Sequence, residues 1–97
     1  MTILTKQQNS QLKGLAHQLK PVVMIGQNGL TEAVIKEAKQ ALEQHELIKI
    51  KIVADKEERL KIRTQIAKKT QSTLVQKIGQ MAVYFKQNPK KPIISLV

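Results

Sequence analysis

Among the segments of this chain, Gly26-Gln27-Asn28-Gly29 has the residue types and spacing best suited to binding a ligand. Its two glycines allow positive φ angles, and without Cβ atoms they let another molecule approach the main chain closely. The segment follows an apolar run, residues 22–25, and precedes a helix predicted to begin after Thr31. Unpaired amide groups at the start of a helix attract phosphate. One interpretation is a phosphate-binding loop in which Gln27 and Asn28 donate neutral hydrogen bonds. The alternative is an ordinary tight turn, because turns use the same spacing.

The remaining residues offer little for catalysis or metal binding. The chain has no cysteine, which excludes disulfides, thiolate zinc ligands and cysteine nucleophiles. His17 and His45 belong to no metal-ligand pair of the His-x-x-x-His or Glu-x-x-His type, and no serine lies in a Gly-x-Ser-x-Gly segment. The acidic residues within 55–58 fall at a predicted helix start, where they act as caps. We therefore expect no enzyme activity, no metal site, no cofactor and no small-molecule substrate.

The charge of the chain points to a polyanionic partner. Seventeen Lys and Arg residues against seven Asp and Glu residues give a formal net charge of +10. The excess is concentrated after residue 55, where Glu57 and Glu58 are the last acidic residues. A domain this basic repels itself, and a polyanion would offset that repulsion. Nucleic acid is the leading interpretation, an anionic membrane surface is the second, and a basic protein that is merely soluble is the third.

Basic residues near the glycine segment are candidate phosphate contacts. Lys13, His17 and Lys20 share one flank of a first helix, which we expect to end at Pro21. Lys49 and Lys51 alternate with isoleucines in a predicted strand. These two lysines either contact the ligand or belong to a solvated strand face.

Three candidates lie later in the chain. Arg59 and Arg63 are four residues apart on a third helix, and their guanidinium groups suit phosphate, although pairing with Glu57 or Glu58 would also explain Arg59. Tyr84 and the next residue, Phe85, point to opposite faces of a strand, and we expect Tyr84 to be the more exposed because its hydroxyl group prefers water. The predicted nucleic-acid-binding residues are Lys13, His17, Lys20, Gly26, Gln27, Asn28, Gly29, Thr31, Lys49, Lys51, Arg59, Arg63 and Tyr84.

The elements that position these residues follow from hydrophobic periodicity and capping signals. Helices are predicted after Thr5, Thr31 and Asp55. Strands are predicted at 22–25, 47–53, 73–78 and 81–86. The first of them is expected to be buried on both faces or to lie at the centre of the sheet, and the last two are joined by a Gly79-Gln80 turn. Residues 87–97 are expected to form a loop and tail, with 93–96 as a short edge strand. The order αβαβαββ predicts one compact α/β domain over residues 1–97, with three helices and a mixed four-stranded sheet.

Three blocks of the sequence resemble the CRM domain family, named for chloroplast RNA splicing and ribosome maturation. They are residues 20–31, residues 46–51, and residues 75–79 followed by Val83-Tyr84. The resemblance implies a fold similar to the C-terminal domain of translation initiation factor three. It also implies an RNA-binding glycine loop similar to that of KH domains, and a role like that of the stand-alone bacterial YhbY-type proteins with large ribosomal subunit precursors. Many members carry a basic residue between the glycines, where this chain has Gln27-Asn28.

Together these features predict recognition of structured RNA, such as ribosomal RNA or its precursor, mostly through its backbone. The alternative is a ribosome-associated protein-interaction module or translation factor that docks a ribosomal protein. A membrane-surface role is disfavoured because none of the predicted helices contains Trp or Phe. The absence of cysteine, of an export-signal pattern and of a long apolar run leads us to expect a cytoplasmic protein. We also expect that a β-branched residue at Gly29 would leave the fold intact.

Overall fold

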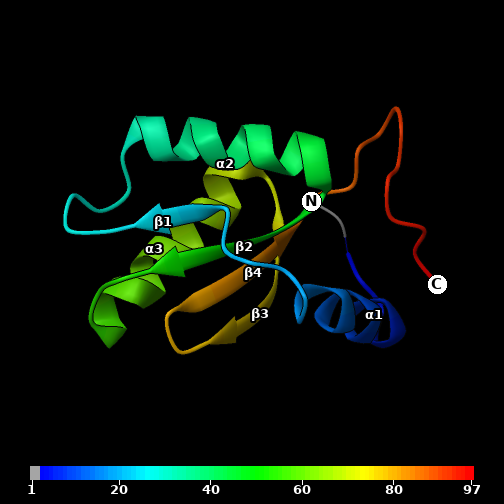
Figure 1. The fold of residues 1–97 in the computed structure, drawn as a ribbon, viewed down its shortest axis with the longest axis horizontal. Coiled ribbons are helices and arrows are strands. Elements are labelled where there is room, and N and C mark those ends of the chain that lie inside the picture. The colour runs from blue at the N-terminus through cyan, green and yellow to red at the C-terminus, as the bar shows by residue number, and fades with distance from the viewer. Residues whose placement is uncertain (1–2) are drawn as a thin grey trace.

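The computed structural model describes residues 3–97, which form the predicted series of three helices and four strands (Figure 1). In chain order these are α1 (Lys6–Ala16), β1 (Val23–Ile25), α2 (Glu32–His45), β2 (Leu47–Ile52), α3 (Lys56–Thr70), β3 (Thr73–Ile78) and β4 (Met81–Phe85). The helices begin where the sequence predicts: the side chains of Thr5, Thr31 and Asp55 each accept a hydrogen bond from a backbone amide in the first turn. These caps satisfy amide groups that otherwise have no partner.

The four strands form one mixed sheet in the order β1-β2-β4-β3. β1 pairs with β2 in parallel, and the other two pairings are antiparallel, so the predicted mixed sheet is confirmed. β1 lies at an edge of the sheet. Residues 93–96 form no strand, so the expected short edge strand at this position is wrong.

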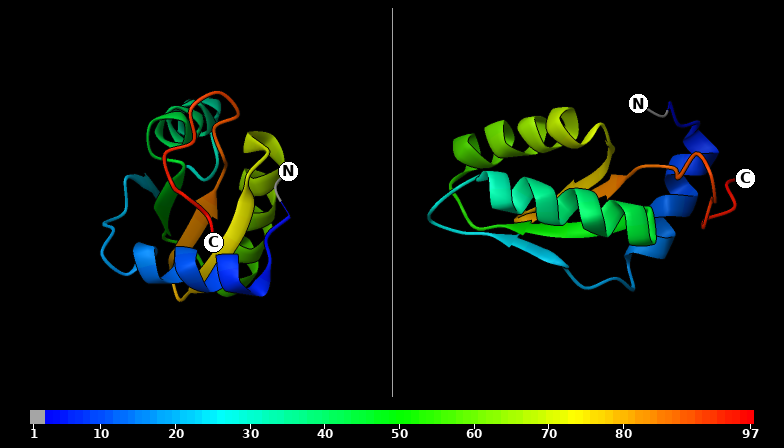
Figure 2. Two further views of the ribbon diagram at one scale, coloured as in Figure 1. Left: turned by 90° about the vertical axis from the view of Figure 1, so that its right-hand side faces the viewer. Right: turned by 90° about the horizontal axis from the view of Figure 1, so that it is seen from above.

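The helices cover the two faces of the sheet unequally. α2 and α3 lie on one side and α1 on the other (Figure 2, left). The side under α2 and α3 holds the larger core, which includes Ile48, Ile50 and Tyr84. The smaller core lies under α1 and includes Leu12 and Phe85. Tyr84 and Phe85 therefore do point to opposite faces, as the strand alternation predicts.

α1 is shorter than expected. It ends at Ala16, with His17 as its C-cap, and the amide of Leu19 then donates to the carbonyl oxygen of Ala16. The chain therefore leaves the helix before Pro21 forces it to, and Lys20 is not on a helix. A short α1 contacts β2, β3 and β4 but leaves part of their face uncovered.

The prediction that the first strand is buried on both faces or lies at the centre of the sheet is wrong. Val23 and Ile25 are buried under α2, but Met24, which points to the other face, is 65% exposed. Val22, just before the strand, is also exposed. The reason is tertiary: β1 is an edge strand, and α1 does not extend over it.

A buried carboxylate fixes the C-terminal tail. Glu46 is fully buried at the C-terminus of α2, where its φ angle is +61°. One carboxylate oxygen accepts hydrogen bonds from the amides of Ile93 (2.8 Å) and Ile94 (2.6 Å), and the other accepts from the amide of Asn88. Ile94 and Leu96 then pack against the core under α1. Glu46 thus ties residues 88–94 to the end of α2.

Replacing Glu46 with Ala is expected to lower the free energy of unfolding by about 2–4 kcal/mol, because several backbone amides lose their acceptor. Chemical denaturation measures the loss, and faster hydrogen exchange at residues 88–94 should accompany it. Glu43→Ala is the matched control, since Glu43 is exposed on the same helix, and it should change stability by less than about 0.5 kcal/mol. Equal stability of the two variants would contradict this role.

Candidate nucleic-acid interface

The glycine segment forms an open turn between β1 and α2. The carbonyl oxygen of Gly26 accepts a hydrogen bond from the amide of Gly29 at 3.0 Å, and Gly29 has a φ angle of +67°. Gly26, Gln27 and Asn28 are exposed. A Cβ atom added to Gly26 or Gly29 would have no other atom within 4 Å. The main chain of this loop is therefore accessible. Of its two glycines, only Gly29 has a backbone conformation, with positive φ, that favours glycine over other residues.

The start of α2 carries a capping hydroxyl group and an acidic side chain. The hydroxyl oxygen of Thr31 accepts a hydrogen bond from the amide of Val34 at 3.2 Å, so Thr31 serves as the helix cap. The exposed Glu32 lies in the first turn, where its negative charge complements the helix dipole. A carboxylate here also repels an approaching phosphate. Attraction at the loop therefore depends on its main chain and on cations from other elements.

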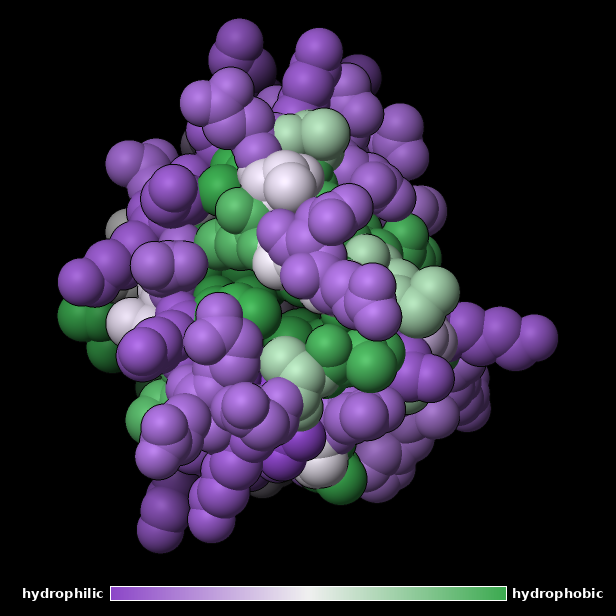
Figure 3. Space-filling model, turned by 90° about the vertical axis from the view of Figure 1, so that its left-hand side faces the viewer, coloured by the Kyte–Doolittle hydropathy of each residue, from purple (hydrophilic) through white to green (hydrophobic). Residues whose placement is uncertain are grey.

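The nearest of those cations lie on the uncovered part of the sheet. Lys51 pairs with Met24 of β1 on one side and with Met81 of β4 on the other. Two positions earlier in β2, Lys49 lines a hollow of about 190 Å³ together with His17. The end of the molecule that carries the loop shows hydrophobic residues gathered centrally with hydrophilic residues around them (Figure 3). The structure thus brings His17, Lys49 and Lys51 onto one face of the sheet, and Lys51 lies beside Met24, two residues before the glycine loop.

The other two predicted residues from the first helix region lie farther along this side. Lys20 and Lys49 line a groove of about 560 Å³ with Leu15 and Val22. Lys13 lines a separate groove with Lys6 and with residues 74–75 of β3. Lys20 therefore extends the surface formed by Lys49, whereas Lys13 lies beside a different part of the sheet.

Arg59, Arg63 and Tyr84 do not join this surface. Arg59 donates from Nη1 to the carbonyl oxygen of Ala54 at 2.9 Å. The Nε atoms of both arginines are buried without a hydrogen-bond partner. Tyr84 is fully buried, and its hydroxyl group donates to the carbonyl oxygen of Arg63 at 2.9 Å. Burial raises the pKa of Tyr84, an effect that the charge of Arg63 partly offsets. The expectation of an exposed Tyr84 is wrong, because α3 covers this face.

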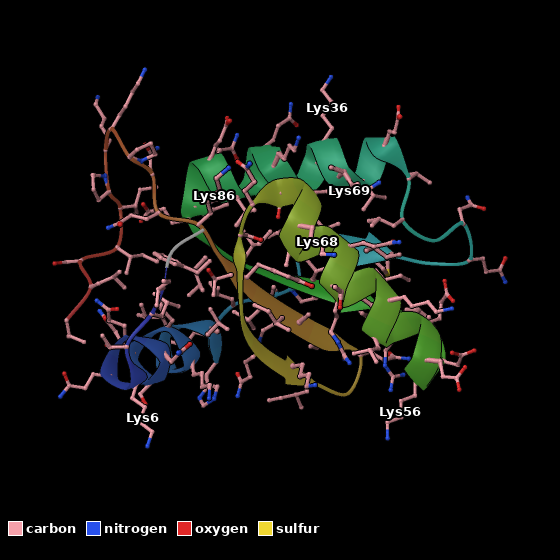
Figure 4. The ribbon with its side chains drawn as sticks, turned by 180° about the vertical axis from the view of Figure 1, so that it is seen from behind. Lys6, Lys36, Lys56, Lys68, Lys69 and Lys86 are labelled. Atoms are coloured by element: carbon pink, nitrogen blue, oxygen red, sulfur yellow. The ribbon has the colours of Figure 1, made fainter. Side chains whose placement is uncertain are left out.

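A second group of cations, absent from the predicted site, lies on the side of α2 and α3. Figure 4, which views the molecule from the side opposite to Figure 1, shows four lysines on this side: Lys36, Lys68, Lys69 and Lys86. The side chain of Lys36 extends outward from α2. A hollow of about 420 Å³ is lined by Lys36, Lys39 and Lys69. Basic side chains therefore occur on both sides of the sheet. Lys36, Lys68 and Lys86 come from different parts of the chain, so their spacing in the sequence does not show that they lie on the same side of the sheet.

Comparison with known proteins defines the class. The sequence pattern of the CRS1 / YhbY (CRM) domain matches residues 4–86, and the chain belongs to this family. An RNA-binding protein of Haemophilus influenzae is 46% identical over 94 residues, covering 96% of this chain and 95% of the relative. A probable RNA-binding protein of Pseudomonas aeruginosa is 43% identical over 88 residues, covering 90% of this chain and 85% of the relative.

A solved structure agrees in fold. The solution structure of a Staphylococcus aureus protein of proposed RNA-binding function superimposes with a TM-score of 0.82 at 32% identity, covering 98% of this chain and 100% of the other. Within residues 3–97 no cluster of three His, Cys, Asp or Glu side chains suitable for a metal ion is found. The helices described there include none long and apolar enough to cross a membrane.

The two glycines of the loop should respond differently to substitution. Gly29→Ala is expected to lower the free energy of unfolding by about 1–2 kcal/mol, because a Cβ atom is strained at positive φ. A β-branched residue at Gly29 would be strained in the same way, so that substitution would lower stability as well as test RNA binding. Gly26→Ala should change stability by less than about 0.5 kcal/mol, since its φ angle is ordinary and its surroundings are open. Thermal or chemical unfolding of both variants would show the difference, and equal losses would contradict it.

Proposed function

We propose that this protein binds RNA by its sugar-phosphate backbone, which lies on the β1–α2 loop while lysines of the neighbouring sheet face hold it. The observation that carries the proposal is the exposed main chain at Gly26–Gly29, placed two residues beyond Met24, the direct cross-strand neighbour of Lys51. Family membership and the names of the relatives support RNA as the ligand. No catalytic step is part of this function.

Backbone recognition also fits the aromatic content of the chain. Proteins that stack bases on aromatic platforms expose Phe, Tyr or Trp side chains. Here the two aromatic residues of the sequence, Tyr84 and Phe85, are both fully buried. Cations can replace stacking as the source of affinity, because each contacted phosphate releases condensed counterions. The resemblance to stand-alone bacterial members favours ribosomal RNA or a precursor of the large ribosomal subunit as the target in the cytoplasm.

The loop is tested by placing a side chain where the RNA backbone would lie. Gly26→Val should weaken RNA binding by roughly five- to tenfold, because a branched side chain keeps the phosphate chain away from the loop. Gly14→Val is the matched control: Gly14 is exposed on α1, and an added Cβ atom there also meets open space. Fluorescence anisotropy with a labelled ribosomal RNA fragment measures both. Wild-type affinity in a folded Gly26→Val variant would refute a role for the loop.

The lysines are tested by comparing two pairs of equal charge. Lys49→Gln/Lys51→Gln should weaken binding about tenfold and reduce the salt dependence of the affinity, because two phosphate contacts are lost. With about five contacts, the wild-type slope of log affinity against log salt should be roughly −3.5 to −4.5.

The control pair is Lys36→Gln/Lys39→Gln, which removes the same charge from the opposite side of the sheet and should have the smaller effect. Equal losses for both pairs would indicate a diffuse electrostatic field in place of a defined surface. Association with ribosomal particles that resists ribonuclease, together with no salt-dependent binding to protein-free RNA, would favour the alternative of docking to a ribosomal protein.

A further inference from the structure

One row of side chains beside the loop is left unexplained by the fold and by backbone binding. The strand register aligns Met24 with Lys51, Lys51 with Met81, and Met81 with Ile78. These four residues form a single line across β1, β2, β4 and β3, and we call it the Met24–Ile78 row. Because side chains of paired residues point to the same face, the whole row lies on the side of α1.

Three of the four residues in the row are apolar, and the row is open to solvent at both ends. Met24 is 65% exposed and Ile78 is 61% exposed, and Lys51 and Met81 between them are half-buried. Neither core cluster includes any of the four. α1 packs over the opposite end of this face, at Leu47 and Phe85. Figure 1 shows the left half of the sheet with no helix in front of it. Apolar side chains gathered on an exposed face commonly mark a binding surface.

The Met24–Ile78 row lies next to the β1–α2 loop, so an RNA strand bound at the loop can reach it. Met24 is followed by Ile25 and then by Gly26, so the row begins where the loop begins. Four adjacent strands span about 14 Å from the first to the last. A chain of nucleotides whose phosphates lie on the loop and on Lys51 would therefore have its bases over the methionines and Ile78. No acidic residue is part of the row or lines the hollow that adjoins it.

We propose that the apolar residues of the Met24–Ile78 row, Met24, Met81 and Ile78, contact the bases of an unpaired RNA segment whose backbone is held by the β1–α2 loop and Lys51. The inference rests on the proposed function and extends it from backbone recognition to a preference for unpaired nucleotides. In a duplex the base faces are stacked and out of reach, so the apolar side chains of the row would have no bases to contact. Flexible methionine side chains adapt to bases of different shape, so the contact should be largely independent of sequence.

The test separates bases from backbone with two RNA probes of equal length and charge. One is a fluorescein-labelled single-stranded octanucleotide, and the other is the same ribose-phosphate chain without bases. Wild-type protein should bind the octanucleotide about five- to tenfold more tightly than the abasic chain at one fixed salt concentration. In the variant Met24→Gln/Ile78→Thr this preference should disappear while affinity for the abasic chain stays unchanged.

The control variant is Leu60→Gln, which removes an apolar side chain that is 55% exposed on α3, on the other side of the sheet. It should keep the wild-type preference, and the melting temperatures of both variants show that they are folded. Equal binding of the two probes by wild-type protein, or a preference that survives in Met24→Gln/Ile78→Thr, would overturn this inference and leave backbone binding intact. Absence of salt-dependent binding to either probe would overturn the proposed function itself.

Discussion

α1 is too narrow to cover the whole face of the sheet on which it packs, and the uncovered part of that face is open to a ligand. A helix with its side chains is about 10 Å wide, and strands of six residues are about 20 Å long, so α1 lying across β2, β3 and β4 covers about half of their face. The opposite face of the sheet is covered by two longer helices, α2 and α3. The uncovered half lies next to the loop that follows β1. Exposure of Met24 and accessibility of Lys51 both result from this incomplete layer.

Attraction of a polyanion and its placement on the surface depend on different features of the protein. Lysines on both sides of the sheet give the chain its strong positive field, which attracts any polyanion without fixing its position. Position requires a close contact, and the exposed main chain at Gly26–Gly29 is where such a contact meets no side chain. Since Glu32 opposes an anion at the start of α2, Lys51 and Lys49 are the cations that best complement the loop.

Local signals allowed the fold to be predicted, and tertiary contacts account for the errors. Capping residues such as Thr31 and Asp55, and the alternation of isoleucine with lysine in β2, act over a few residues and can be recognised in the sequence. The alternation of side chains along β4 also predicts correctly that Tyr84 and Phe85 lie on opposite faces of the sheet. It does not indicate how well the helices cover each face, so the burial of Tyr84 could not be predicted from it. Glu46 was missed as a structural residue because its amide partners lie more than forty positions later.

The central claim is that RNA meets the protein at the β1–α2 loop and the open half of the sheet. The most direct measurement is a titration of isotope-labelled protein with a single-stranded RNA octanucleotide, followed by the backbone amide signals in NMR spectra. The account predicts that the largest shifts occur at residues 24–29, 49–51 and 78–81. Shifts concentrated at Lys36, Lys68 and Lys69, with the loop signals unchanged, would contradict it.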